Sequence, residues 1–118
     1  MPILNALASV AVKDMARAVP WYASLFGRPP DARPMPEVAE WKFEHGGWLQ
    51  VYLGPERAGS GSVTLAVSSI DEQLAALANC GVAAGSRATG PLVKTLMISD
   101  PDGNHIAFAE AIDPKMAR

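Results

Sequence analysis

The sequence predicts an α+β fold built from two similar halves, and the main observation is an internal repeat. A short β-prone run with alternating residues at 8–12 (ASVAV) recurs 55 residues later at 63–67 (VTLAV). Each run is followed by a helical pattern and then by further β-prone runs in meander order. The matching order of elements favours two tandem modules over a single ferredoxin-like sandwich, which would need fewer strands.

In the first half, a helix is predicted from Asp14 to Phe26. Asp14 can cap its first turn and Gly27 can end it, whereas Pro20 predicts a kink or a restart inside it. Strands are predicted over 38–43 and 48–53, joined by His45-Gly46-Gly47. The stretch 27–36 contains four prolines and predicts a rigid, irregular loop.

In the second half, a helix is predicted over 70–79 and ends near Gly81. Ser69 with Glu72 three residues later is a capping box. Strands are predicted over 93–99 and 104–109, joined by the tight turn Asp100-Pro101-Asp102-Gly103. The stretch 54–61 (GPERAGSG) predicts a hinge between the halves.

Composition limits the possible chemistry. The 118 residues, 49% hydrophobic and 19% charged, suffice for one well-packed core but not for two large domains. A net charge of −2 gives no electrostatic footprint for nucleic acid, and no apolar run is long enough to span a membrane. One cysteine and two histidines exclude an intrachain disulfide, a cysteine-based zinc cluster and a histidine-rich metal site. No targeting segment is evident, and a cytoplasmic location is expected.

Strand alternation assigns the side chains to two faces. The strongly apolar set should pack under the helices: Val10, Val12, Leu49, Val51, Leu53, Val63, Leu65, Val67, Ile106 and Phe108. The opposite set should line a cavity: Ser9, Ala11, Trp48, Gln50, Tyr52, Thr64, Ala66, His105, Ala107 and Ala109.

The hairpin between the first two meander strands predicts an aromatic wall. A two-residue turn at 45–46 or at 46–47 would put Trp41, Phe43, Trp48 and Tyr52 on one face with Gln50. Such a wall suits a flat, partly apolar ligand that stacks on rings and is oriented by one hydrogen bond. The alternative interpretation, of comparable weight, is packing in the core or in a dimer interface.

Several polar residues have simpler interpretations. Asp100 and Asp102 are expected to bond the local backbone of their turn. Glu40 and Lys42 are interpreted as solvated surface, and His105 as an exposed residue just past the turn, although its ordinary pKa would suit a general base.

Five segments together give a family resemblance. They are SVAVKDM at 9–15, WYASLFG at 21–27, GGWLQVYL at 46–53, SVTLAVSSIDE at 62–72 and DPDGNHIAFAE at 100–110. In this order they resemble the glyoxalase/bleomycin-resistance/dioxygenase (vicinal oxygen chelate) superfamily, from about Leu4 to Glu110. The turn DPDGN leading into an apolar strand is the most specific of them.

The resemblance implies two tandem βαβββ modules, about 4–54 and 61–111, in a single domain over 1–118. Their strands would form a curled mixed sheet, or partial barrel, around a cavity, with the helices on the outer face. Members of the superfamily are usually homodimers.

The resemblance also implies four metal-ligand positions, which fall on Leu7, Gln50, Ser62 and Ala107. Leu and Ala offer no lone pair, Ser is a poor ligand, and one neutral amide cannot hold a catalytic metal. No metal and no other cofactor are therefore expected.

The favoured function is metal-independent binding of a small, flat, partly aromatic molecule by a homodimer, with no nucleic-acid or membrane partner. The expected ligand-binding residues are Trp41, Phe43, Trp48, Gln50, Tyr52, Ser62, Thr64 and His105. One alternative is a metal-independent enzyme, lyase-like or isomerase-like, that uses His105 or Tyr52. Others are a structural dimer with a filled cavity and a metal-dependent glyoxalase or dioxygenase, the last disfavoured by the ligand positions.

Overall fold

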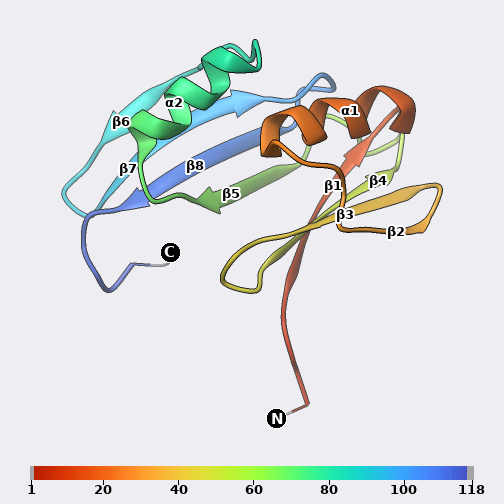
Figure 1. The fold of residues 1–118 in the computed structure, drawn as a ribbon, viewed down its shortest axis with the longest axis horizontal. Coiled ribbons are helices and arrows are strands. Elements are labelled where there is room, and N and C mark those ends of the chain that lie inside the picture. Colours follow the sequence, from red (N-terminus) through yellow and green to blue (C-terminus); the bar gives the residue numbers. More distant parts are fainter. Residues whose placement is uncertain (1, 117–118) are drawn as a thin grey trace.

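The computed structural model, which describes residues 2–116, contains two four-stranded sheets with one helix against each (Figure 1). The first module consists of β1 (Leu7–Val12), α1 (Met15–Phe26), β2 (Ala32–Met35), β3 (Val38–Lys42) and β4 (Trp48–Leu53). The second module consists of β5 (Ser62–Ala66), α2 (Ile70–Asn79), β6 (Arg87–Thr89), β7 (Val93–Ser99) and β8 (His105–Ala111). The predicted α+β fold of two tandem βαβββ modules is confirmed, whereas the exact module boundaries stay a prediction.

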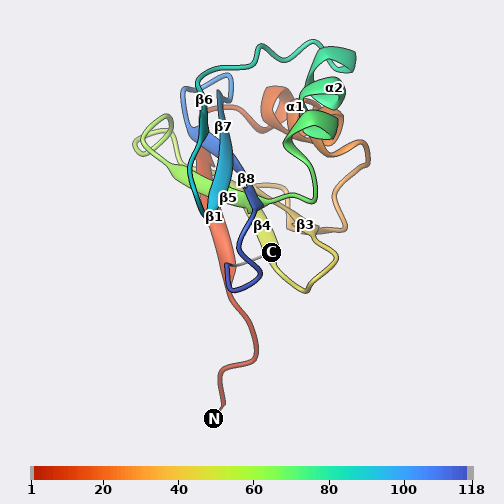
Figure 2. The ribbon, with the colours of Figure 1, turned by 90° about the vertical axis from the view of Figure 1, so that its left-hand side faces the viewer.

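Both sheets have the same topology. The strand order is β1-β4-β3-β2 in the first sheet and β5-β8-β7-β6 in the second, and in each the first strand runs parallel to the last. Within residues 2–116 no strand of one sheet pairs with a strand of the other, so the sheets do not close into a barrel. Both helices lie on the same side of the sheets, which leaves the other side without a helical cover (Figure 2).

The helix-facing side of both sheets forms the core, as the alternation of the strands predicts. Val10, Val12, Leu49, Val51, Val63, Ile106 and Phe108 are all buried. Leu65 and Val67 are half-buried against this core, and Leu53, at the end of β4, is 40% exposed. A chain of ring contacts links α1 to this core, from Tyr22 and Phe26 to Trp41.

The helix ends confirm the predicted capping residues. The Asp14 side chain accepts a hydrogen bond from the N–H of Ala16, and Gly27 ends α1 with a left-handed backbone (φ 71°). The Ser69 side chain accepts from the N–H of Glu72, at 3.2 Å, at the start of α2. The helix does not restart at Pro20, since α1 continues through it without interruption, and the expected kink stays a prediction.

Two short edge strands, which the βαβββ modules include, were not assigned to residues from the sequence pattern. The proline-rich stretch 27–36 contains β2, which pairs irregularly with β3, and β6 adds three residues to the outer edge of β7. An edge strand tolerates Pro34 because one row of its backbone groups faces away from the sheet. No helix among the described residues is both long and apolar enough to cross a membrane.

Candidate ligand-binding face

The register of the β3–β4 hairpin decides which side chains lie away from the helices. Trp41 pairs with Leu49, Glu40 with Gln50, and Lys42 with Trp48. The connection therefore spans the five residues 43–47, in place of the expected two-residue turn, and the Phe43 N–H donates to the Gly47 carbonyl within it. The pairing differs by one residue from the expected alternative with a turn at 45–46, which moves the β3 side chains to the opposite face.

The expected aromatic wall is consequently wrong for two of its members. Trp41 is fully buried on the helix side, where its indole N–H donates to the Arg28 carbonyl at 3.1 Å. Phe43 packs edge-to-face against Phe26, with ring centroids 5.4 Å apart. Both rings belong to the core, in agreement with the packing alternative.

The side of the first sheet that no helix covers keeps the other half of the predicted wall. We call it the open face, formed by Ser9 of β1, Glu40 and Lys42 of β3, and Trp48, Gln50 and Tyr52 of β4. The three β4 side chains are half-buried, because they alternate with the fully buried Leu49 and Val51.

A chain of hydrogen bonds crosses the open face over three neighbouring strands. The amide nitrogen of Gln50 donates to Oε2 of Glu40 at 2.8 Å, and the hydroxyl of Ser9 donates to Oε1 of Gln50 at 3.2 Å. Glu40 is half-buried in this arrangement, so the expectation that it is simple solvated surface is wrong. Only the pairing of Glu40 with Gln50 between β3 and β4 reveals this position, and no pattern of neighbouring residues in the sequence predicts that pairing.

The aromatic side chains flank this polar chain along β4. Lys42 is exposed, as expected, and its ammonium lies 5.9 Å from the centroid of the Trp48 ring, which is a cation–π distance. Tyr52 lines a hollow of about 260 Å³ together with residues 54–57. The open face thus offers two ring surfaces on either side of one amide and one carboxylate.

The remaining predicted site residues lie on the second sheet. Ser62 pairs with His105, and Thr64 pairs with Ala107, and all three polar side chains are exposed. No hydrogen bond described in residues 2–116 joins them to Trp48, Gln50 or Tyr52. The structure therefore places the predicted site residues in two groups, one on each sheet.

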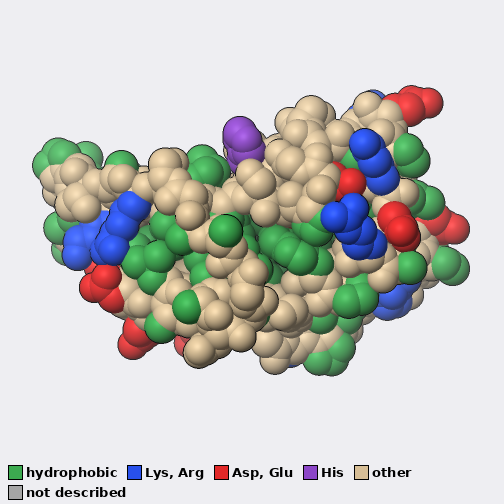
Figure 3. All heavy atoms as spheres, turned by 90° about the horizontal axis from the view of Figure 1, so that it is seen from above, with side chains coloured by type: hydrophobic (Ala, Val, Ile, Leu, Met, Phe, Trp, Pro, Cys, Tyr) green, Lys and Arg blue, Asp and Glu red, His purple; other side chains and the backbone are tan. Residues whose placement is uncertain are grey.

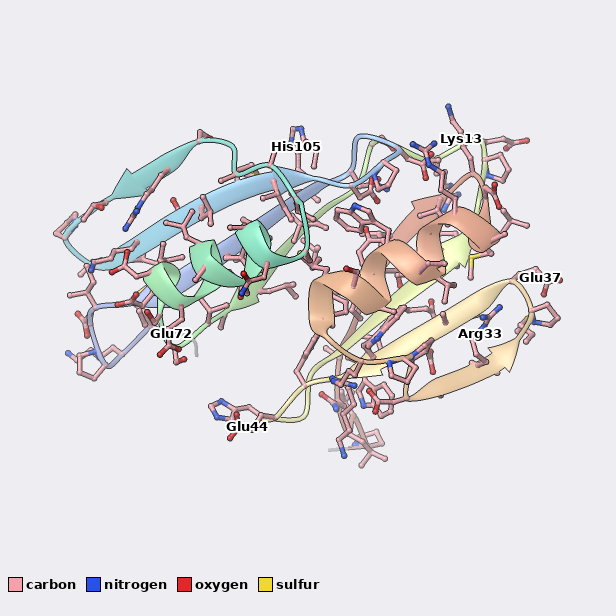
Figure 4. All side chains as sticks on the ribbon, turned by 45° about the horizontal axis from the view of Figure 1, so that its top comes forward. Lys13, Arg33, Glu37, Glu44, Glu72 and His105 are labelled. Atoms are coloured by element: carbon pink, nitrogen blue, oxygen red, sulfur yellow. The ribbon has the colours of Figure 1, made fainter. Side chains whose placement is uncertain are left out.

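His105 lies at a groove between the modules. The groove, of about 810 Å³, is lined by Arg17 and Trp21 of α1, by residues 81–86 and 97–101, and by His105. The imidazole points outward, away from both helices (Figure 4). Seen from above, most charged side chains gather toward the two ends of the molecule, and few lie in its middle (Figure 3).

The turn 100–104 forms a buried polar network. The sequence predicts only those of its hydrogen bonds that lie within the turn itself. Oδ1 of Asp100 accepts from the N–H groups of Asp102 and Asn104, as expected. Asn104 is fully buried, donates to the Ala11 carbonyl and to Oδ2 of Asp100, both at 2.8 Å, and accepts from Gly59 and Gly61. Asn104 thereby ties the second module to β1 and to the connecting segment 54–61.

Tyr22 completes this network from α1. Its hydroxyl donates to Oδ2 of Asp100 at 2.7 Å. Burial, and then the hydrogen bond and the negative charge of Asp100, raise the pKa of the Tyr22 phenol far above its usual range. Tyr22 is therefore a permanent neutral donor in the folded protein.

Replacing Tyr22 by phenylalanine should test this role through the pH dependence of stability. The folded phenol keeps its proton, whereas the unfolded phenol loses it above about pH 10. The stability due to this group is thus full below about pH 10 and falls by about 1.4 kcal/mol per pH unit above it. We expect Tyr22→Phe to cost about 1–2 kcal/mol at pH 7 and to make the alkaline decline shallower. Urea unfolding from pH 7 to pH 11 measures both effects, and an unchanged alkaline slope would contradict the assignment.

Metal binding has no obvious set of ligands here. Among residues 2–116, no group of three or more His, Cys, Asp or Glu side chains is placed to hold a metal ion.

Comparison with solved structures identifies the family. A glyoxalase/bleomycin resistance protein from Catenulispora acidiphila is 38% identical, with a TM-score of 0.84 over 92% of this chain and 99% of that one. The antibiotic binding protein TnmS3 from Streptomyces sp. CB03234 is 28% identical, with a TM-score of 0.78 over 94% of this chain and 98% of that one. A lactoylglutathione lyase from Agrobacterium tumefaciens shares the fold. It is 15% identical, with a TM-score of 0.74 over 92% of this chain and 94% of that one.

The two tandem βαβββ modules, each with a helix on one side only, define the vicinal oxygen chelate class of proteins. Within that class, the chain belongs to the glyoxalase/bleomycin resistance protein family, as the 38% identity over nearly the full length of both chains establishes. A scan against protein-family models finds no match. A search of curated proteins finds none either.

Proposed function

We propose that this chain is a metal-independent binding protein that holds a flat, partly aromatic small molecule on its open face. The observation that carries the proposal is the combination of Trp48 and Tyr52 with the chain Ser9–Gln50–Glu40 on one uncovered sheet surface. Half-buried rings supply apolar contact area, and the fixed amide and carboxylate supply orientation. The 28% identity to an antibiotic binding protein supports a small-molecule ligand.

The residues at the four positions that the resemblance implies for metal ligands support metal independence. Leu7 and Ala107 carry no donor atom, and Ser62 is a weak ligand for a transition metal. Gln50 has a suitable oxygen, but that oxygen accepts from Ser9. This donor set does not fit a divalent metal, which needs about three protein ligands.

We further propose that the protein is a homodimer, in which a second copy covers the open face. In one chain this face is bounded by no helix, and Leu7 at its edge is 50% exposed. A partner surface would turn an open sheet into an enclosed site, and Ser62, Thr64 and His105 are candidates to line it from the second sheet. Sedimentation equilibrium at micromolar concentration tests the proposal, and a monomer without and with ligand would refute it.

A metal-independent enzyme remains the alternative, with His105 or Tyr52 as the acid or base. The ion pairs found within residues 2–116 are Arg28–Asp31 and Arg87–Asp71, so no carboxylate forms an ion pair with His105 there. A general base needs such an orienting partner to hold one tautomer. The binding function therefore accounts for more of the geometry.

Binding of aromatic antibiotics tests the proposed function directly. We expect at least one planar aromatic compound of a panel to quench tryptophan fluorescence saturably. Tyr52→Leu should lower the affinity for that compound by about 3–10-fold, since an aromatic contact is worth about 0.5–1.5 kcal/mol. Tyr22→Phe, which changes a tyrosine outside the open face, should leave the affinity for that compound within about twofold of the wild type.

Elemental analysis of the purified protein should find no stoichiometric metal, and a tightly held divalent ion in each chain would contradict metal independence.

A further inference from the structure

The direction of the hydrogen bonds on the open face restricts which ligand can bind there. A carboxylate can only accept, so the group of Gln50 that faces Glu40 at 2.8 Å must be its NH₂. The oxygen of Gln50 must then face Ser9, whose single proton is used in that bond at 3.2 Å. The free hydrogen-bonding capacity is thus mostly accepting: the second carboxylate oxygen of Glu40 and lone pairs of Ser9, against one remaining N–H of Gln50.

The charge of Glu40 is not neutralised within the described chain. The two ion pairs found in residues 2–116 are Arg28–Asp31 and Arg87–Asp71, and neither involves the open face. Lys42 lies two residues along β3 on the same face, but its ammonium contacts the ring of Trp48. A half-buried carboxylate without a cation favours a ligand that brings a positive charge to it.

Lys42 also shows that the Trp48 ring can receive a cation. Its ammonium lies 5.9 Å from the ring centroid, on an exposed and flexible side chain that a ligand can displace. Trp48 and Tyr52 are separated by Gln50 on β4, and Gln50 is the register partner of Glu40. A flat ring system that covers both aromatic side chains therefore passes directly beside the carboxylate.

We infer that the ligand of the open face is a flat aromatic cation, such as an aromatic amine or amidine, whose N–H groups donate to Glu40. This inference rests on the proposed binding function and adds the charge and polarity of the ligand. The rings of Trp48 and Tyr52 would hold its plane, while Glu40, fixed by Gln50, would select its charge. An anionic aromatic of the same shape would meet a carboxylate and lone pairs, and would be rejected.

Three acridines of the same ring size test the inference, with fluorescence anisotropy of the acridine as the signal. At pH 7 they are 9-aminoacridine, which is a cation, acridine, which is neutral, and acridine-9-carboxylate, which is an anion. We expect the cation to bind about tenfold or more tightly than neutral acridine, and the anion to bind weakest, because a hydrogen bond to a charged group is worth about 1.5–3 kcal/mol.

Two variants assign that preference to named residues. Glu40→Gln keeps an acceptor for Gln50 and should remove most of the preference for 9-aminoacridine while sparing neutral acridine. Glu37→Gln makes the same change of net charge at the exposed β2–β3 turn and should leave all three affinities unchanged. Lys42→Met removes the ammonium that competes for the Trp48 ring and should raise the affinity for 9-aminoacridine about 2–5-fold.

The outcomes separate the two proposals. Equal binding of the three acridines, or a preference for the cation that Glu40→Gln leaves intact, would overturn the inference but not the binding function. No binding of any acridine would count against both. A gain of affinity in Lys42→Met is informative even if Glu40→Gln unfolds, because a destabilised protein does not bind more tightly.

Discussion

Replacing Asn104 by alanine is expected to lower the free energy of unfolding by about 3–5 kcal/mol. The substitution removes four hydrogen bonds from a fully buried side chain and leaves the Gly59 and Gly61 N–H groups and Oδ2 of Asp100 with fewer partners. Each buried polar group left without a partner costs about 1–3 kcal/mol, and water that enters the site recovers part of it. Urea unfolding followed by circular dichroism measures the difference.

The matched control is Asn5→Ala. Asn5 is also an asparagine whose amide donates to a backbone carbonyl, that of Gly46, but it is exposed. We expect this variant to stay within about 0.5 kcal/mol of the wild type. If Asn104→Ala were as mild as the control, the buried network would not stabilise the fold, and the turn would be only a local feature.

The position of Asn104 has a consequence for how the two modules behave. Its side chain joins the start of β8 to the end of β1 and to the connecting segment 54–61, and the backbone N–H of Lys13 donates to Asp102 of the same turn. The second module's β7–β8 turn is thereby bonded to the first module. The modules should consequently unfold in one transition, and the Asn104 variant is the one most apt to separate them into two.

The sequence was sufficient for the elements that depend on local rules. The range of α2, its cap at Ser69 and the Gly27 end of α1 follow from positional preferences within a few residues. The core face followed from simple alternation along β1, β4, β5 and β8. The edge strands β2 and β6 were not predicted because both are short and β2 is proline-rich. Each forms because it pairs with a longer neighbour, β3 or β7, and not because of its own strand propensity.

The candidate site depended on one residue of register, which local rules could not supply. Gly46-Gly47 is a good two-residue turn, yet the chain uses five residues there. Distant contacts favour the longer loop, since Arg28 donates to the Lys42 carbonyl and Asp31 accepts from the Lys42 N–H. The ring contacts of Trp41 with Tyr22 and Phe26 fix the same register from the core side. The sequence thus identified the open-face side chains of β4 correctly. In β3 it assigned Trp41 to this face, whereas the register places Glu40 and Lys42 there.

This register makes opposite predictions for two tryptophans that the sequence alone treats alike. Trp41→Ala is expected to cost about 3–5 kcal/mol of unfolding free energy, because it empties a fully buried site in contact with Tyr22 and Phe26. Trp48→Ala removes a half-buried ring from the open face and should cost no more than about 1 kcal/mol. Urea unfolding of both variants gives the comparison.

Ligand affinity should show the reverse order. Trp48→Ala should weaken 9-aminoacridine at least about tenfold while the fold is retained, because the ligand loses its stacking surface. Trp41→Phe, which keeps a large ring in the core and is therefore measurable where Trp41→Ala is too unstable, should change that affinity by less than about twofold. If instead Trp41→Phe abolished binding and Trp48→Ala did not, β3 would present its other face to the ligand. Glu40 would then lie on the helix side among the buried core side chains, and the cost of burying its charge there is the reason to expect the first result.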